Sequence, residues 1–241
     1  MEHPAGCIST TDSVTFLFLP SPPCCTAVKT IMRVLIFGAS KGLGLETTRQ
    51  ALEAGYDVRA LARTANAIAI ANTGLEKMRG NGLKAEDVEA ALVGVDVVIQ
   101  TLGVGLGELF QPVHLFSDAT KILIAAMKKK SIKRLICVTG FGAGDSRASI
   151  SCLQRMPFQI IFGRAYGDKT LQEQLVKESE LDWTIARPGV LTSGPRTGRY
   201  KILSEESQWR NGIISRANVA EFLVQQVEDR AHIGKALVLI N

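Results

Sequence analysis

Three glycines near position 40 have the spacing of a turn that binds phosphate. Gly38, Gly42 and Gly44 follow the apolar run 34–37, and apolar residues then recur at helical spacing. In such a turn the backbone can approach an anion closely, and the N–H groups and dipole of the next helix attract it. We therefore expect a strand, turn and helix that bind a dinucleotide diphosphate. The alternative is that the glycines only shape a turn. Contacts are also expected from Ser40, Lys41 and Leu43.

Basic side chains stand where the second strand of such a unit ends. The pattern at 56–62 predicts that strand, with Arg59 inside it, Arg63 just after it and no acidic residue beside them. An acid there commonly binds the ribose of NAD, whereas the 2′-phosphate of NADP needs cations. We therefore predict NADP(H) as the cofactor, with Ser40, Lys41 and Arg63 around that phosphate. The alternative is that these cations only face solvent.

The remaining chain alternates strand and helix patterns. Strands are expected at 75–78, 95–101, 134–139, 182–186 and 236–240, and helices at 85–92, 115–126, 168–179 and 219–227. This alternation predicts an α/β fold: a Rossmann-type doubly wound parallel sheet with helices on both faces and a small C-terminal region that covers the substrate. Ligands bind at the carboxyl ends of such strands, which places Leu102 and Gly103 beside the cofactor.

Length and composition fit one domain and argue against several kinds of partner. The chain of 241 residues is 46% hydrophobic, which is enough for a large core. Its net charge of +5 is scattered, and the one compact basic run, 128–130, suits a helix end better than a nucleic-acid surface. No apolar segment is long enough to span a membrane. The cysteines and histidines lack metal-ligand spacing, so we expect no metal, reduced thiols and a cytoplasmic location.

The first 31 residues differ in composition from the rest. Prolines 20, 22 and 23 lie beside an apolar run, 14–19, that lacks a positive flank and is short for a signal peptide. Because Met32 directly precedes the first strand, we expect residues 1–31 to be a disordered leader or an upstream extension of the reading frame. The single NAD(P)-binding domain would then span 32–241, with substrate-covering segments near 141–165 and 190–215. Limited proteolysis tests this division, and a protease-resistant leader would contradict it.

Several motifs together resemble the short-chain dehydrogenase/reductase superfamily. They are the glycine turn, Leu102-Gly103, the Val-Thr-Gly sequence at 138–140, the Arg-Pro-Gly sequence at 187–189 and the Ser-Arg-Ala-Asn-Val-Ala sequence at 215–220. Residues 32–241 most resemble the atypical NAD(P)H-binding branch, which includes biliverdin-IXβ/flavin reductase and the NmrA-like regulators. The resemblance implies that Asn81 lies near the adenine, where relatives usually carry an acid, and that Pro188 and Val190 pass the nicotinamide.

The resemblance supplies only part of the superfamily's usual catalytic set. That set is a Tyr acid, a Lys four residues later that lowers the Tyr pKa and holds the ribose, and a Ser that orients the carbonyl. Lys169 matches the Lys, but Ala165 stands four residues before it. Tyr166 is three residues before, a shift of about 100° around a helix. The Ser position falls on Gly140, which leaves Thr139 as the nearest hydroxyl. The expected catalytic residues are therefore Thr139 and Lys169.

Two classes of function fit this incomplete set. The first is an NADPH-dependent reductase that transfers hydride to a small planar acceptor, a flavin, quinone, enone or carbonyl, with Lys169 on the ribose and Thr139 on the acceptor. The second is a non-enzymatic NmrA-like regulator that senses NADP(H). We favour the reductase, acting as a monomer or homodimer on a small molecule.

The acceptor would lie over the nicotinamide, between the loop 140–147 and the segments 153–162 and 191–209. These segments carry enough apolar surface for a planar molecule, although they could equally form core or an oligomer contact. The apolar residues are Met156, Phe158, Ile160, Phe162, Tyr200 and Trp209.

Overall fold

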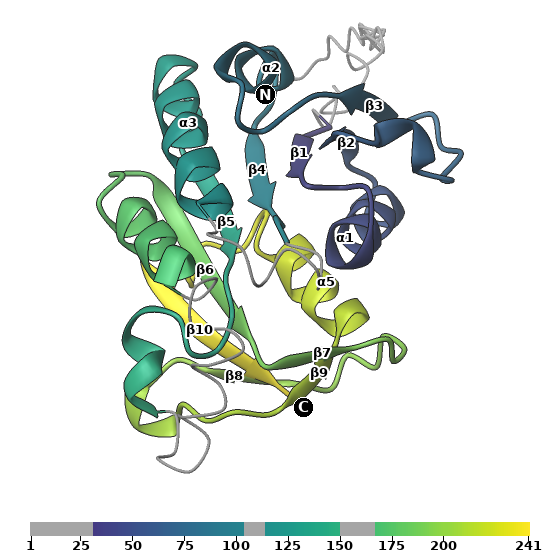
Figure 1. Ribbon diagram of the computed structural model, residues 1–241. Coiled ribbons are helices and arrows are strands. Elements are labelled where there is room, and N and C mark those ends of the chain that lie inside the picture. The colour runs from purple at the N-terminus through teal and green to yellow at the C-terminus, as the bar shows by residue number, and fades with distance from the viewer. Residues whose placement is uncertain (1–30, 104–113, 150–166) are drawn as a thin grey trace, which may run out of the picture. The chain divides into compact units, whose positions relative to one another are not determined.

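An eight-stranded, mostly parallel sheet organises the fold (Figure 1). The computed structural model describes residues 31–103, 114–149 and 167–241, and residues 31–241 form one compact unit. The strand order is β3-β2-β1-β4-β5-β6-β10-β8. The strands are β1 (Arg33–Phe37), β2 (Asp57–Ala62), β3 (Leu75–Arg79), β4 (Val97–Gln100), β5 (Arg134–Val138), β6 (Asp182–Pro188), β8 (Lys201–Leu203) and β10 (Lys235–Ile240). This order confirms the Rossmann-type arrangement.

Helices cover both faces of this sheet, as the alternating pattern predicts. Figure 1 shows α1 and α5 side by side on one face, and α2 and α3 belong to the other. The described helices are α1 (Gly42–Glu53), α2 (Ala85–Ala91), α3 (Leu115–Lys129), the helix over 167–177 and α5 (Arg216–Gln225). The central strands β1, β4 and β5 are therefore buried on both sides.

The side chains of β1 explain why its sequence is apolar throughout. Val34 and Ile36 pack into the core under α1 and α5, whereas Leu35 and Phe37 pack into the core under α2 and α3. Neighbouring side chains in a strand point to opposite faces, so a strand covered on both sides needs an apolar residue at every position. This central strand fixes the start of the glycine turn.

The region after β6 contains short strands that the sequence patterns do not predict. β7 (Val190–Thr192) and β9 (Ile213–Ser215) pair with each other as a separate parallel sheet. β8 pairs antiparallel with β10 and lies at the edge of the otherwise parallel sheet. Strands of three residues are too short to show a periodic pattern, and their pairing depends on distant segments. They lie in the segment 190–215, which we expected to cover the substrate.

Two element boundaries also differ from expectation. α5 begins at Arg216, three residues early, because the Ser215 hydroxyl accepts a hydrogen bond from the N–H of Asn218 at 3.0 Å and caps the helix. β6 runs two residues further than expected and ends at Pro188, because β10 pairs with it as far as Leu239. Both shifts bring residues from the Arg-Pro-Gly and Ser-Arg-Ala-Asn-Val-Ala sequences into regular structure.

Trp209 belongs to a small apolar core and not to an open substrate surface. Its ring is buried with Phe141, Leu203 and Val238, and its indole N–H donates to the carbonyl oxygen of Leu203 at 3.1 Å. Of the alternatives left open for this residue, burial of the ring therefore favours core over a place in the acceptor site. The other apolar residues suggested there include Met156, Phe158, Ile160 and Phe162, which lie outside the described residues.

Two further features concern membranes and metals. Within residues 31–103, 114–149 and 167–241, no helix is long and apolar enough to cross a bilayer. The same ranges contain no cluster of three or more His, Cys, Asp or Glu side chains placed to hold a metal ion.

Candidate functional site

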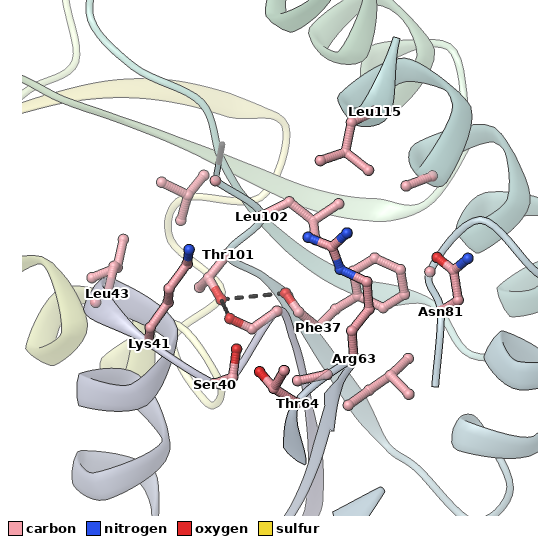
Figure 2. A pocket seen from close by; sticks show the side chains of 18 of the residues that line it. Phe37, Ser40, Lys41, Leu43, Arg63, Thr64, Asn81, Thr101, Leu102 and Leu115 are labelled. Atoms are coloured by element: carbon pink, nitrogen blue, oxygen red, sulfur yellow. Dashed lines mark hydrogen bonds between the residues drawn. The ribbon is translucent and has the colours of Figure 1, made fainter. Parts of the chain in front are cut away.

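A pocket of about 780 Å³ opens at the carboxyl ends of β1, β2, β4 and β5 (Figure 2). Its lining brings together most of the site residues predicted from the sequence. These are Gly38, Ser40, Lys41, Gly42, Leu43, Arg63, Asn81, Leu102, Gly103, Thr139 and Lys169. They come from separate parts of the chain and meet because parallel strands present their carboxyl ends at one edge of the sheet.

The glycine turn is shaped by close backbone contacts. Gly38 and Gly42 have φ values of +100° and +58°, which favour glycine. A Cβ on Gly44 would lie 2.2 Å from the carbonyl oxygen of Gly38 and 2.7 Å from the Thr101 hydroxyl. The Thr101 hydroxyl itself donates to the carbonyl oxygen of Phe37 at 3.3 Å, as Figure 2 shows. Gly44 therefore does not line the pocket but lets α1 pack directly behind the turn.

The N-terminus of α1 is open to an anion. Its N-cap residue, Lys41, makes no side-chain capping hydrogen bond, and the first turn contains no acidic residue. The first N–H groups of a helix lack partners within the helix, and the dipole makes this end positive. Because Gly42 begins α1 and lines the pocket, these N–H groups can serve a bound phosphate.

Two exposed cations extend into this pocket from the turns that follow the neighbouring strands β1 and β2. Figure 2 shows Lys41 rising from the glycine turn and Arg63 rising from the end of β2, with Asn81 beyond Arg63 in this view. The side-chain carbonyl of Asn81 accepts from the N–H of Leu83 at 3.1 Å, so its amide N–H groups are the donors it can offer a ligand. The donor set therefore suits a ligand with several anionic groups.

Arg59 has a structural role. Its guanidinium is buried, contacts the carboxylate of Glu76 at 2.8 Å and donates to the carbonyl oxygens of Ala91 and Val93. These contacts join β2 to β3 and to the end of α2. Of the two arginines that the sequence offered near the 2′-phosphate, only Arg63 lines the pocket.

Lys169 enters the pocket from the helix over 167–177. Its ammonium group donates to the carbonyl oxygen of Thr139 at 2.7 Å and lies 4.5 Å from the centre of the Phe116 ring. Burial lowers the pKa of Lys169 to about 8. The neighbouring Asp168 carboxylate accepts from the N–H of Phe116 at 2.8 Å, which holds this helix against the start of α3.

The Thr139 hydroxyl is engaged by a buried ion pair. It donates to the Glu173 carboxylate at 2.7 Å, and Glu173 also binds the Arg187 guanidinium through two hydrogen bonds. Glu173 and Arg187 are both almost fully buried. A hydroxyl has one proton, so in this arrangement Thr139 can accept from a substrate but not donate to it. Sequence reasoning missed this pair, although an arginine inside an apolar strand is an unusual signal.

Some predicted residues lie outside the pocket lining, and others were missed. Neither Pro188, which is buried in β6, nor Val190, which is exposed at the start of β7, lines the pocket. Leu191 does line it. Ala165 and Tyr166 lie outside the described residues. The lining residues that were not predicted as ligands include Thr64, Thr101, Leu115 and Arg216.

Comparison with known proteins agrees with this geometry. A family model described as NAD(P)H-binding matches residues 38–230. The chain belongs to this NAD(P)H-binding family. The structure of ChuY, described as an anaerobilin reductase from Escherichia coli, is 30% identical, with a TM-score of 0.73 over 87% of this chain and 97% of that chain. The expected NAD(P)H-binding family is thereby confirmed, and the finding is consistent with the narrower resemblance to atypical short-chain dehydrogenases/reductases.

Two further relatives have other descriptions. An uncharacterised chloroplast protein of Arabidopsis thaliana is 27% identical over 205 residues, 83% of this chain and 72% of that protein. The photosystem II assembly factor Ycf39 of Synechocystis is 26% identical over 206 residues, 82% of this chain. This chain spans 59% of the length of Ycf39. The chain is thus similar both to a protein described as a reductase and to one described as an assembly factor, so similarity alone does not assign a reaction.

Proposed function

We propose that this protein is an NADPH-dependent reductase that transfers hydride to a small planar acceptor such as a flavin, quinone, enone or carbonyl. The observation that carries the proposal is the convergence of Lys41, Arg63 and Lys169 with the glycine turn in one pocket. Membership of the NAD(P)H-binding family and likeness to the reductase ChuY support it.

The pocket residues divide into groups that fit the parts of NADPH. The N–H groups at the start of α1 suit the diphosphate, and Arg63 suits the 2′-phosphate of the adenosine ribose. Lys169, which contacts the Thr139 carbonyl oxygen just after β5, suits the ribose of the nicotinamide half. When bound, the nicotinamide supplies the hydride. The chain's own residues orient the cofactor and hold its negative charges.

Proton supply favours conjugated acceptors over simple carbonyls. The described lining of the pocket includes no tyrosine, and the Thr139 proton is directed to Glu173. A simple carbonyl needs an acid at its oxygen as hydride arrives, whereas a reduced flavin or quinone can take its proton from solvent. We therefore expect the fastest turnover with acceptors that spread the incoming charge over a conjugated system.

NADPH oxidation across an acceptor panel tests the reductase. Calorimetry first establishes the NADPH concentration that saturates the protein. NADPH absorbance is then followed with flavins, quinones, enones, simple carbonyls and anaerobilin, the last because of the likeness to ChuY. Turnover with a conjugated acceptor is expected.

Lys169→Met should reduce kcat/KM roughly tenfold or more, because a charged hydrogen bond to the ribose is lost. The exposed Lys235→Met, outside the described pocket, is the matched control and should leave it unchanged.

A non-enzymatic NADP(H)-sensing regulator is the second candidate. The Thr139 hydroxyl donates its proton to Glu173 and so does not offer it to a substrate, which favours this candidate. The similarity to a protein described as an assembly factor also favours it. Saturating NADPH binding without turnover on any acceptor would decide for the regulator. Failure to bind either NADPH or NADH would contradict both functions.

We also propose that the protein acts in the cytoplasm as a monomer or homodimer, without a nucleic-acid or membrane partner. The scattered charge and the buried free thiol of Cys137 support this proposal. Light scattering of the purified protein and fractionation of cells that produce it are the tests. A higher oligomer, or recovery with membranes, would contradict the proposal.

A further inference from the structure

Arg216 is a further cation of the pocket, in addition to Lys41, Arg63 and Lys169. It is the first residue of α5, is half-buried and lines the pocket. Its Nε atom lies 3.9 Å from the position that a Cβ on Gly42 would occupy. Because Gly42 begins α1, the Arg216 guanidinium stands next to the open N-terminus of that helix.

The charge of Arg216 is not compensated locally. On nearby surfaces, Arg49 pairs with Glu46 and Glu53, and Arg196 lies 3.5 Å from Glu53 and 3.9 Å from Glu221. Among the described residues, Arg216 pairs with no carboxylate. Its Nη1 atom donates to the Ser193 hydroxyl at 3.3 Å. A cation at the first position of a helix also faces the positive end of the dipole, which is unfavourable.

The position of Arg216 is fixed by the surrounding elements. The preceding residue, Ser215, caps α5 and donates its own hydroxyl proton to the carbonyl oxygen of Pro195 at 2.9 Å. The Gln50 amide of α1 donates to the carbonyl oxygen of Ala217 at 2.9 Å, which joins the two helices at this point. Because the backbone at Arg216 is already fixed, only the side chain has to be ordered when it binds an anion.

We propose that Arg216 binds the diphosphate of the dinucleotide, across the start of α1, an assignment that rests on the proposed function. An anion there would be attracted by the N–H groups of α1 and would compensate the charge of Arg216. Arg63 comes from a different element, the end of β2, and suits the 2′-phosphate. The two arginines should therefore discriminate between different phosphates of the same molecule.

Calorimetric binding of three nucleotides to the full chain separates these roles. NADP⁺ carries both the diphosphate and the 2′-phosphate, NAD⁺ carries only the diphosphate, and adenosine 2′-monophosphate carries only the 2′-phosphate. Arg216→Gln keeps much of the side-chain size and removes the charge. It should weaken NADP⁺ and NAD⁺ equally, by roughly tenfold, and leave adenosine 2′-monophosphate unchanged. Arg216→Lys should retain part of the lost affinity because it keeps a charge.

Arg196→Gln is the matched control, because Arg196 is a nearby arginine that already has carboxylate partners. It should leave all three affinities unchanged. Unchanged NADP⁺ and NAD⁺ affinities in Arg216→Gln would overturn the assignment. A loss confined to NADP⁺, or an equal loss for adenosine 2′-monophosphate, would also overturn it. Failure of the unsubstituted protein to bind any dinucleotide would instead refute the proposed function itself.

Discussion

Arg59 and Arg63 have different roles because one lies inside β2 and the other follows its end. Arg59 lies inside the strand, where burial requires charge pairing and hydrogen bonds to carbonyl oxygens. Arg63 follows the strand, is exposed and lines the pocket, and no carboxylate of the described ranges pairs with it. An exposed cation without a partner remains available to a ligand phosphate, so cofactor preference should depend on Arg63 and not on Arg59.

Arg63→Ala should change the preference between the two dinucleotides. We expect NADPH affinity to fall roughly tenfold or more, because a charge-assisted contact to the 2′-phosphate is lost. NADH lacks that phosphate, so its affinity should stay the same. Calorimetry measures both. Arg230→Ala is the control. Arg230 is exposed and lies near Asp182, the first residue of β6, so it is at the amino ends of the parallel strands, and its loss should change neither affinity. Equal losses for NADPH and NADH in Arg63→Ala would contradict the predicted NADP preference.

Lys169 should make cofactor binding depend on pH. Burial lowers its pKa from 10.5 to about 8, so the ammonium form is lost as pH rises through about 8. An anionic dinucleotide favours the charged form, so its affinity should be constant below that pH and fall above it, with proton uptake on binding near pH 8. Calorimetry in buffers of different ionisation enthalpy measures the protons. Lys169→Met should bind more weakly at neutral pH and lose this dependence. An unchanged pH profile in Lys169→Met would show that Lys169 does not cause the pH dependence of cofactor binding.

At the scale of elements, the contact between the glycine turn and α1 leaves no space for a side chain at Gly44. Gly44→Ala forces the helix away from the turn, so we expect the free energy of unfolding to fall by about 1–3 kcal/mol. NADPH and NADH affinities should fall together, because the helix N-terminus moves. A Cβ on Gly103 meets nothing within 4 Å, so Gly103→Ala should keep the unfolding free energy unchanged. Urea denaturation compares the two variants, and equal stability would show that the turn tolerates the methyl group.

At the scale of the whole molecule, the Glu173–Arg187 pair connects segments that surround the pocket. It joins the helix over 167–177 to β6, contacts the Thr139 hydroxyl after β5 and places Arg187 4.7 Å from the Trp209 ring centre. Glu173→Gln leaves a buried guanidinium without its counter-charge, so we expect a loss of about 3–5 kcal/mol in the free energy of unfolding.

Arg49→Ala is the comparison for that variant. Arg49 also contacts two carboxylates, but it is exposed, so its loss should be about 1 kcal/mol or less. Thermal and urea unfolding measure both variants. Similar small losses in the two would show that the buried pair does not hold the segments together.

The sequence by itself determined the parts of this protein that depend on local pattern. The glycine turn requires particular backbone angles at Gly38 and Gly42, and the strands and helices of the Rossmann-type fold follow from apolar periodicity. Lys41 and Arg63 could be placed at the pocket because each adjoins a predicted strand or turn. These features need only neighbouring residues for their interpretation.

Tertiary structure alone decided which distant side chains meet. Arg216 reaches the glycine turn because α5 packs on α1. The Thr139 hydroxyl donates to Glu173, which in turn pairs with Arg187. The short strands after β6 form only through pairing with remote segments. Such contacts depend on how the crossovers bring elements together, and residue type and spacing along the chain do not contain that information.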